Sequence, residues 1–529
     1  MVGHIEGIAR GQWSLLPAQL DDYVGADHIA RVIDAFVERA ELGDLGFGRV
    51  IAKATGRPGY HPSDLLKLYV YGYVHGCQSS RRLEAEGLRN IEVKWLLRGL
   101  TPDFRTIAHF RHDNATAIVA VCAAFVQFCR RQGQLGSREV AIDGTKIRAV
   151  ASPRGVVKKT KVLKELGELK EKIGKYLAAL DEADKAESGE ASLQEKAAWA
   201  RRALEKLQRR KGVLEDLQQV IEASGRETLV PGEPEARPMM CNQRPVGPAY
   251  NVQTAVSTDT HLIVHFEVTQ DLNDRHQLVP MAEAAQQVLA LQPSLPASGR
   301  PAAEGLQQAG EPAACIPPVA ASQQADATQP LAAEAASTAP AASDDGAGAL
   351  QVLADSGYSN GEHAARCEAL GIVACAPPQR SVNSKGLFDR SSFTYDAGSN
   401  TYVCPAGERL HFKQHHNADK LDRYEARDCS NCVLKPQCTT TNQRTVSRSW
   451  YENELGRMAQ RLAADPSLMQ RRRATVEHPF GTLKAIFGGR FLTRNLKGAR
   501  TETALQVLAY NIKRLTALCG AQALVEALA

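Results

Sequence analysis

The sequence predicts an α/β protein in which several insertions interrupt a mixed β-sheet. Two short apolar runs, 140–147 and 350–358, each carry an Asp followed by small residues, as expected of buried strands that present an acid at one end of a sheet. Segments 250–256 and 261–268 alternate apolar and polar residues around a turn at 257–260, which indicates a β-hairpin. A strand, a helix and a strand between 350 and 376 complete the α/β pattern.

Residues 1–134 are predicted to form an all-helical N-terminal domain. Segment 27–37 resembles a capped amphipathic helix, and 61–71 has a Pro at its first turn and an apolar face. Segments 83–97 and 101–111 continue the pattern, and the latter carries Arg105, His109 and Arg111. A DNA-binding helix-turn-helix module and a plain packing or dimerisation domain both fit these helices.

Residues 135–157 contain the first strand of the core, with Asp143 inside it. Lys146 and Arg148 follow at alternating spacing, so they face either a phosphate group or solvent. An isolated Asp-Gly pair is more often a turn, and the prediction of a site therefore depends on the other acids.

Residues 158–222 predict a helical hairpin inserted after the first strand. Apolar residues recur at alternating spacings of four and three, at Val162, Leu166, Leu169, Ile173, Tyr176 and Leu180. Segment 187–189 breaks the helix before the spacing resumes at Leu204. The hairpin is either an arm for dimerisation or DNA, or a self-packed spacer.

Residues 223–291 return to the core with the β-hairpin and a helix predicted from Asp274 toward Leu289. Asp271 and Asp274 are alternative acids for a site, but they are interpreted here as helix-capping residues. Residues 292–349 are rich in Ala, Pro, Gln, Ser and Gly and lack aromatic residues, which predicts a disordered insertion in a surface loop. Residues 350–394 resume the core with Asp355, so the core is discontinuous.

Residues 395–445 are predicted to form a small Cys-rich insertion. Cys429 and Cys432 have the spacing of a metal knuckle, and Cys404 and Cys438 would complete a four-thiolate structural zinc site. His411, His415 and His416 are substitute ligands for zinc. The alternative is four reduced thiols packed in a small β-rich unit.

Residues 446–529 are predicted to be the C-terminal helices of the core. Glu477 lies four residues after Arg473 and seven before Lys484, so all three share one face of a helix. Pro479 predicts a kink beside Glu477. Segment 491–500 is predicted to be a basic loop that carries Arg494 and Lys497.

Charge is distributed unevenly along the chain of 529 residues, whose net charge is +5. Between 444 and 500 there are twelve Lys and Arg against four Asp and Glu, which favours a polyanionic partner. Twelve Cys without a signal-peptide pattern, and no apolar run of membrane-spanning length, predict a cytoplasmic protein that contacts no membrane.

With Asp143, Asp355 and the Arg473-x3-Glu477-x6-Lys484 pattern together, the chain resembles bacterial insertion-sequence transposases of the DDE class. The resemblance covers most of the chain from about residue 60. The family often has a Tyr three residues before the Arg, whereas this chain has Gln470. The resemblance implies a ribonuclease-H-like mixed sheet flanked by helices, and it marks the three acids as catalytic ligands of two Mg²⁺ or Mn²⁺ ions.

The same resemblance implies a DNA transposase that cleaves element ends and joins them to target DNA. Its partners would be the terminal inverted repeats and target DNA, bound by at least a homodimer. The cations expected to contact DNA are Arg472, Arg473, Lys484, Lys146, Arg494 and Lys497. The alternatives are a metal-dependent nuclease on the same fold and a non-catalytic DNA-binding relic of a transposase.

Overall fold

The computed structural model describes residues 19–52, 55, 58–185, 191–241, 245–290, 349–379, 386–417 and 419–529. The predicted disordered insertion at 292–349 and the helix break at 187–189 therefore lie almost wholly outside the described residues. Within these ranges no single helix is long and apolar enough to span a membrane, although two helices bent by 75° meet that test as a pair. Short 3-10 turns are η1 (Leu20–Tyr23), η2 (Pro153–Gly155), η3 (Ser356–Tyr358) and η4 (Arg390–Ser392).

The N-terminal part is helical, as the sequence predicts. Its elements are α1 (Ile29–Arg39), α2 (Pro62–Val74), α3 (Ser80–Arg89), α4 (Ile91–Leu96), α5 (Phe104–Asp113) and α6 (Ala115–Arg131). His61 caps α2, with Pro62 in its first turn, and Asp103 caps α5 by accepting from two backbone N–H groups. Every residue of α2 is buried, so this helix forms the centre of the helical part.

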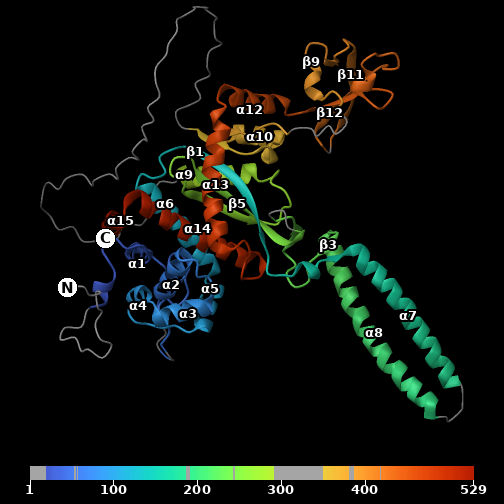
Figure 1. Cartoon of the computed structure of the whole chain (residues 1–529). Coiled ribbons are helices and arrows are strands. Elements are labelled where there is room, and N and C mark those ends of the chain that lie inside the picture. The colour runs from blue at the N-terminus through green and yellow to red at the C-terminus, as the bar shows by residue number, and fades with distance from the viewer. Residues whose placement is uncertain are drawn as a thin grey trace, which may run out of the picture.

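A mixed six-stranded sheet forms the centre of the molecule (Figure 1). Its strands are β1 (Glu139–Arg148), β4 (Arg237–Met239), β5 (Gly247–Ser257), β6 (Ile263–Thr269), β7 (Leu350–Leu353) and β8 (Ile372–Cys375). The order is β4-β5-β1-β7-β8, and β6 pairs with β5. β5 is antiparallel to β1, while β7 is parallel to both β1 and β8. The sequence correctly predicts an α/β fold.

Helices from distant parts of the chain cover this sheet. α9 (Leu278–Ala290) packs on β6, β5 and β1, and α13 (Ser467–Phe487) packs on β1, β5 and β7. α14 (Asn495–Cys519) contacts β6 together with α2 and α6, so it joins the sheet to the N-terminal helices. One apolar core therefore extends from α1 through the sheet to the C-terminal helices.

The predicted helical hairpin consists of α7 (Lys159–Lys185) and α8 (Ala191–Ser224) and projects away from the rest of the molecule (Figure 1). Its base is closed by a two-stranded sheet of β2 (Val157–Lys158) and β3 (Thr228–Leu229). Val162, Leu166, Leu214, Ile221 and Leu229 form a separate apolar cluster there. The hairpin thus has its own small core, which is consistent with a self-packed unit.

A second, antiparallel sheet of five strands lies at residues 394–449. Its strands are β9 (Thr394–Asp396), β10 (Thr401–Val403), β11 (Arg409–His416), β12 (Leu421–Ala426) and β13 (Thr445–Ser449), and α11 (Lys435–Cys438) adjoins them. Leu410 and Tyr424 are buried in its own core. This is the β-rich unit that contains the four clustered cysteines.

The remaining C-terminal and core helices are α10 (Gly361–Ala369), α12 (Glu452–Ala464) and α15 (Ala521–Leu528). The predicted basic loop at 491–500 is wrong in its second half, because α14 already begins at Asn495. The reason is a cap from a distant segment: the carboxylates of Glu233 and Glu235 accept the N–H groups of Asn495 (3.2 Å) and Leu496 (2.6 Å).

Candidate active site

Asp143 lies in the middle of β1, at the point where that strand loses one neighbour. β1 pairs with β5 as far as Arg148, but it pairs with β7 only along Glu139–Ala141. The side chain of Asp143 is therefore 24% exposed, and its Oδ1 accepts the N–H of Gly144 at 2.8 Å. Asp143 thus occupies an opening at the end of the parallel part of the sheet.

Asp355 reaches the same opening from β7, two residues after that strand ends. Its Oδ1 accepts the N–H of Gly357 at 2.8 Å and so caps the turn η3. The side chain is 46% exposed. Because β1 and β7 are adjacent and parallel, two acids separated by more than two hundred residues of sequence become neighbours.

Arg472 of α13 joins the two acids. Its Nη2 lies 3.0 Å from Oδ1 of Asp143 and 3.8 Å from Oδ2 of Asp355, and its side chain is only 13% exposed. Its Nε is buried and has no hydrogen-bond partner among the described residues. A single cation therefore already occupies the space shared by the two carboxylates.

The acidity of Asp143 reflects this environment. Burial raises the pKa of Asp143 to about 6, and the nearby charges of Asp355 and Asp274 add to that rise. The guanidinium of Arg472 and the N–H of Gly144 act in the opposite direction on the same pKa. Burial is the largest of these effects, so Asp143 gains from any cation that compensates its charge.

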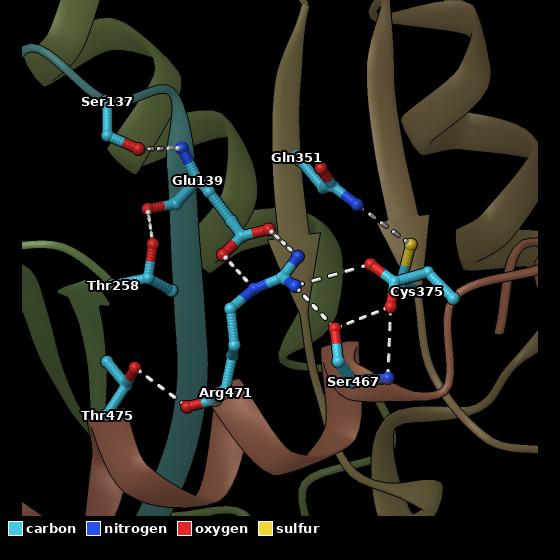
Figure 2. Close-up of polar contacts among 9 residues, drawn as sticks. Ser137, Glu139, Thr258, Gln351, Cys375, Ser467, Arg471 and Thr475 are labelled. Carbon is cyan, nitrogen blue, oxygen red and sulfur yellow. Dashed lines mark hydrogen bonds and ion pairs between the residues drawn. The ribbon is translucent and has the colours of Figure 1, made fainter. Parts of the chain in front are cut away.

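A second arginine fixes α13 against the start of β1 (Figure 2). Arg471 donates from Nε and Nη2 to the two carboxylate oxygens of Glu139, at 3.2 and 3.0 Å. The same guanidinium reaches Ser467 (2.7 Å) and Asp465 (3.3 Å) at the beginning of the helix. Neighbouring arginines thus contact two acids of one strand, which sets the position of α13 along β1.

Glu477, the third predicted acid, is not brought to the other two. It is exposed on α13, as are Arg473 and Lys484, so the predicted shared face exists and points to solvent. No group of three or more His, Cys, Asp or Glu side chains is arranged to hold a metal ion within the described ranges. α13 continues through Pro479 to Phe487 as one helix.

The other predicted DNA-contacting cations lie in different surroundings. Arg494 and Lys497 are exposed at the start of α14, and Lys146 is half-buried in β1.

An open pocket of about 640 Å³ adjoins Asp355 at the ends of β7 and β8. Its lining residues are Asp355, Ser356, Gly357, Pro377, Pro378, Gln379, Met469, Arg472 and Arg473.

Asp274 is a polar neighbour of the site that the sequence interprets wrongly as a helix cap. α9 begins only at Leu278, and Oδ1 of Asp274 instead accepts from Nδ2 of Asn251 (2.7 Å) and Nε2 of Gln253 (2.6 Å) on β5. The one signal in the sequence is Gly144, where a Cβ would lie 2.7 Å from that oxygen. Gly144 leaves room there for Gln253, whose Nε2 would lie 2.2 Å from such a Cβ, as well as for Asp274.

The four cysteines of the small sheet lie near one another. Cys438 is buried in its apolar core, with Cys404 and Cys429 packed against that core. Burial raises the pKa of the Cys438 thiol, and the neighbouring cysteines, Cys432 included, raise it further. Four thiols therefore gather at the small sheet, and their assignment to zinc or to packed reduced thiols stays a prediction.

Two of the three histidines that were predicted as substitute zinc ligands lie beside aspartates. Nδ1 of His415 lies 2.7 Å from Asp422, and Nδ1 of His416 lies 2.9 Å from Asp419. His411 pairs with Thr401 in the ladder between β11 and β10.

Comparison with known families matches two parts of the chain. A family model described as "Transposase domain (DUF772)" matches residues 18–113, which include α1–α5. A model described as "Transposase DDE domain" matches residues 403–516, which include most of the small sheet and all of α12 and α13. Neither the curated proteins nor the solved structures contain a match. A transposase family model thus matches at each end of the chain, which supports an insertion-sequence transposase of the DDE class.

Proposed function

We propose that this transposase cleaves the ends of its insertion element and joins them to target DNA, using Asp143, Asp355 and Glu477 as ligands of two divalent metal ions. The observation that carries the proposal is the meeting of Asp143 and Asp355 around one guanidinium. The strand order β6-β5-β1-β7-β8, with β5 antiparallel to β1, supports a ribonuclease-H-like core.

The donor set fits Mg²⁺ or Mn²⁺. Both groups are carboxylates, which hard divalent cations prefer, and they lie close enough to share a cation. When bound, two such ions would activate the attacking hydroxyl and stabilise the leaving oxygen at phosphorus. The protein itself supplies position and charge.

Glu477 would join the aspartates through a movement of α13. It follows Arg472 by five residues, or about 140° around the helix axis, so the two side chains cannot face the aspartates together. Arg473 and Lys484 share the exposed face of Glu477. DNA phosphates bound to Arg473 and Lys484 would draw the Glu477 face of α13 toward the DNA. Arg472 would then leave the aspartates and contact a phosphate.

Other basic side chains would extend the DNA-binding surface. Arg494 and Lys497 lie at the first turn of α14, whereas Lys146 lies three residues beyond Asp143 on β1 and therefore on the opposite face of that strand. Joining two element ends requires at least two copies of the chain. Its DNA substrate assigns the enzyme to the bacterial cytoplasm.

The decisive experiment incubates purified protein with DNA that carries the element's own ends, with and without Mg²⁺ or Mn²⁺. We expect new 3′-hydroxyl ends that depend on the metal and disappear in Asp143→Asn, Asp355→Asn and Glu477→Gln, while DNA binding remains. Glu454→Gln on the neighbouring helix α12 is the matched control and should cleave normally.

Three outcomes separate this function from its alternatives. Cleavage followed by joining to a target plasmid supports a transposase, whereas cleavage without joining under any condition identifies a nuclease. Binding without cleavage in every metal identifies a DNA-binding relic. Full activity in one of the acid variants removes that residue from the site.

A further inference from the structure

A buried polar network lies near the two aspartates, on the face of β1 that is opposite Arg472. Asn251 and Gln253 are fully buried and occupy alternate positions on β5, so their amides point to the same face of the sheet. Both amides donate to the single oxygen Oδ1 of Asp274, at 2.7 and 2.6 Å. Nδ2 of Asn251 also donates to the backbone carbonyl of Asp271 at 3.3 Å, so Asp274 is the acceptor that the two buried amides share, from the loop before α9.

The network continues to the turn that carries Asp355. Nε2 of Gln253 also donates to Oδ1 of Asn251 at 3.0 Å, and its Oε1 accepts the hydroxyl of Tyr358. Tyr358 is fully buried in η3, three residues after Asp355. The position of this turn is thus coupled to Asp274 through Gln253.

Asp274 lies on the opposite side of β1 from Arg472. Successive side chains of a strand point to opposite faces, and Asp143 faces Arg472 while the position of Gly144 faces Gln253 and Asp274. A Cβ at Gly144 would lie 2.2 Å from Nε2 of Gln253 and 2.7 Å from Oδ1 of Asp274. The charge of Asp274 still acts on Asp143, whose pKa it raises.

We propose that Asp274 is a positioning residue of the site: it fixes the Asp355 turn through Gln253 and Tyr358, and its charge behind β1 strengthens the attraction of a divalent cation to Asp143 and Asp355. This inference rests on the proposed function, because it assumes a metal at these two aspartates. Asp274 itself needs no contact with the metal or the DNA.

The test measures Mn²⁺ affinity of the full-length protein by calorimetry, without DNA and independently of activity. Asp274→Asn retains an acceptor oxygen for both amides but removes the charge, and we expect Mn²⁺ binding about tenfold weaker. Asp274→Ala also removes the acceptor, so its affinity should fall further. Gly144→Ala should imitate that loss, because its new Cβ collides with the network.

Asp271→Asn is the matched control. Asp271 is exposed three residues earlier in the same loop, and its carboxylate accepts from Gln277 at 2.5 Å rather than from β5. Its Mn²⁺ affinity should equal that of the wild type. The melting temperature of each variant, measured without metal, separates unfolding from a loss of affinity.

The outcomes distinguish this inference from the proposed function. If Asp143→Asn loses Mn²⁺ binding but Asp274→Asn and Asp274→Ala stay within twofold of the wild type, Asp274 has no such role. If Asp274→Ala lowers only the melting temperature, its role is structural alone, and the proposal is wrong. If Asp143→Asn also binds Mn²⁺ normally, the metal site itself fails, and this inference falls with it.

Discussion

Arg472 is the residue whose position says most about the resting state of the protein. Its guanidinium is almost buried between Asp143 and Asp355, where a divalent cation would otherwise compensate the same two charges. If the contact of Arg472 with the two aspartates is broken, their buried charges have no partner. If the contact stays intact, Arg472 lowers the affinity of the two aspartates for a metal ion. Under the proposed function, Arg472 and a metal ion would therefore compete for one site.

This competition predicts that the loss of Arg472 raises Mn²⁺ affinity but lowers the melting temperature. Arg472→Gln should bind Mn²⁺ about tenfold more tightly, because the competing cation is gone. The same variant should melt about 2–4 °C lower without metal, because the two acids then repel each other. Calorimetry and thermal melting measure the two effects on one preparation.

Arg457→Gln is the matched control for that prediction. Arg457 of α12 pairs with Glu368 of α10 instead of with the two aspartates, so its loss should not change Mn²⁺ affinity. Weaker Mn²⁺ binding by Arg472→Gln would mean that Arg472 supports the aspartates rather than competing for them.

Buried and distant glutamates hold the start of α14 in place. Besides the cap from Glu233 and Glu235, the fully buried Glu502 of α14 accepts the backbone N–H groups of Leu492 and Thr493. These contacts fold the segment before α14 back onto the helix. The exposed cations Arg494 and Lys497 are presented by this arrangement.

Glu502 should make the stability of the protein depend on pH. Burial raises the pKa of Glu502, so the folded protein binds its proton more tightly than the unfolded chain. Stability from this group is present at low pH and declines as the pH rises above the ordinary range of a glutamate. Relative to Glu502→Gln, the wild-type melting temperature should therefore fall as the pH rises above about 4.5.

The matched control for this pH dependence is Glu526→Gln. Glu526 is exposed on α15 and accepts only from Gln522 one turn earlier. Its difference from the wild type should stay constant across the same range. A constant difference for Glu502→Gln as well would contradict the raised pKa of Glu502.

The elements also show which features of the sequence carried structural information. The strands around Asp143 and at 250–256 were predicted because their patterns are local. The start of α14 was missed because its caps lie about 260 residues away in sequence, at Glu233 and Glu235. Asp274 was misinterpreted for the same reason: its partners are on β5, and only Gly144 hinted at them.

At the scale of the whole molecule, the core is assembled around insertions. α7 and α8 leave and rejoin it through the short β2–β3 pair, and 291–348 separates α9 from β7. Segment 293–348 has no aromatic residue and few large apolar residues, so its composition does not favour a core. The described residues of α7 and α8 are not among those that contact Asp143 or Asp355.

We therefore expect a variant with 293–348 replaced by a short Gly-Ser linker to fold and cleave DNA like the wild type. The linker needs only to join the end of α9 to the start of β7, and loop length has a weak effect on stability. The melting temperature and the cleavage assay measure the outcome. Loss of cleavage at an unchanged melting temperature would give the segment a function.

The pairing of β1 with β7 has a consequence for how the enzyme is made. Residue 143 leaves the ribosome long before residue 355, and α13 with Arg472 and Glu477 follows later still. Until then the edge of β1 has no partner strand on that side, and such open edges invite wrong pairing. A nascent or truncated chain accordingly lacks part of the proposed set of metal ligands, so the proposed cleavage of DNA would begin only after nearly the whole protein has been synthesised.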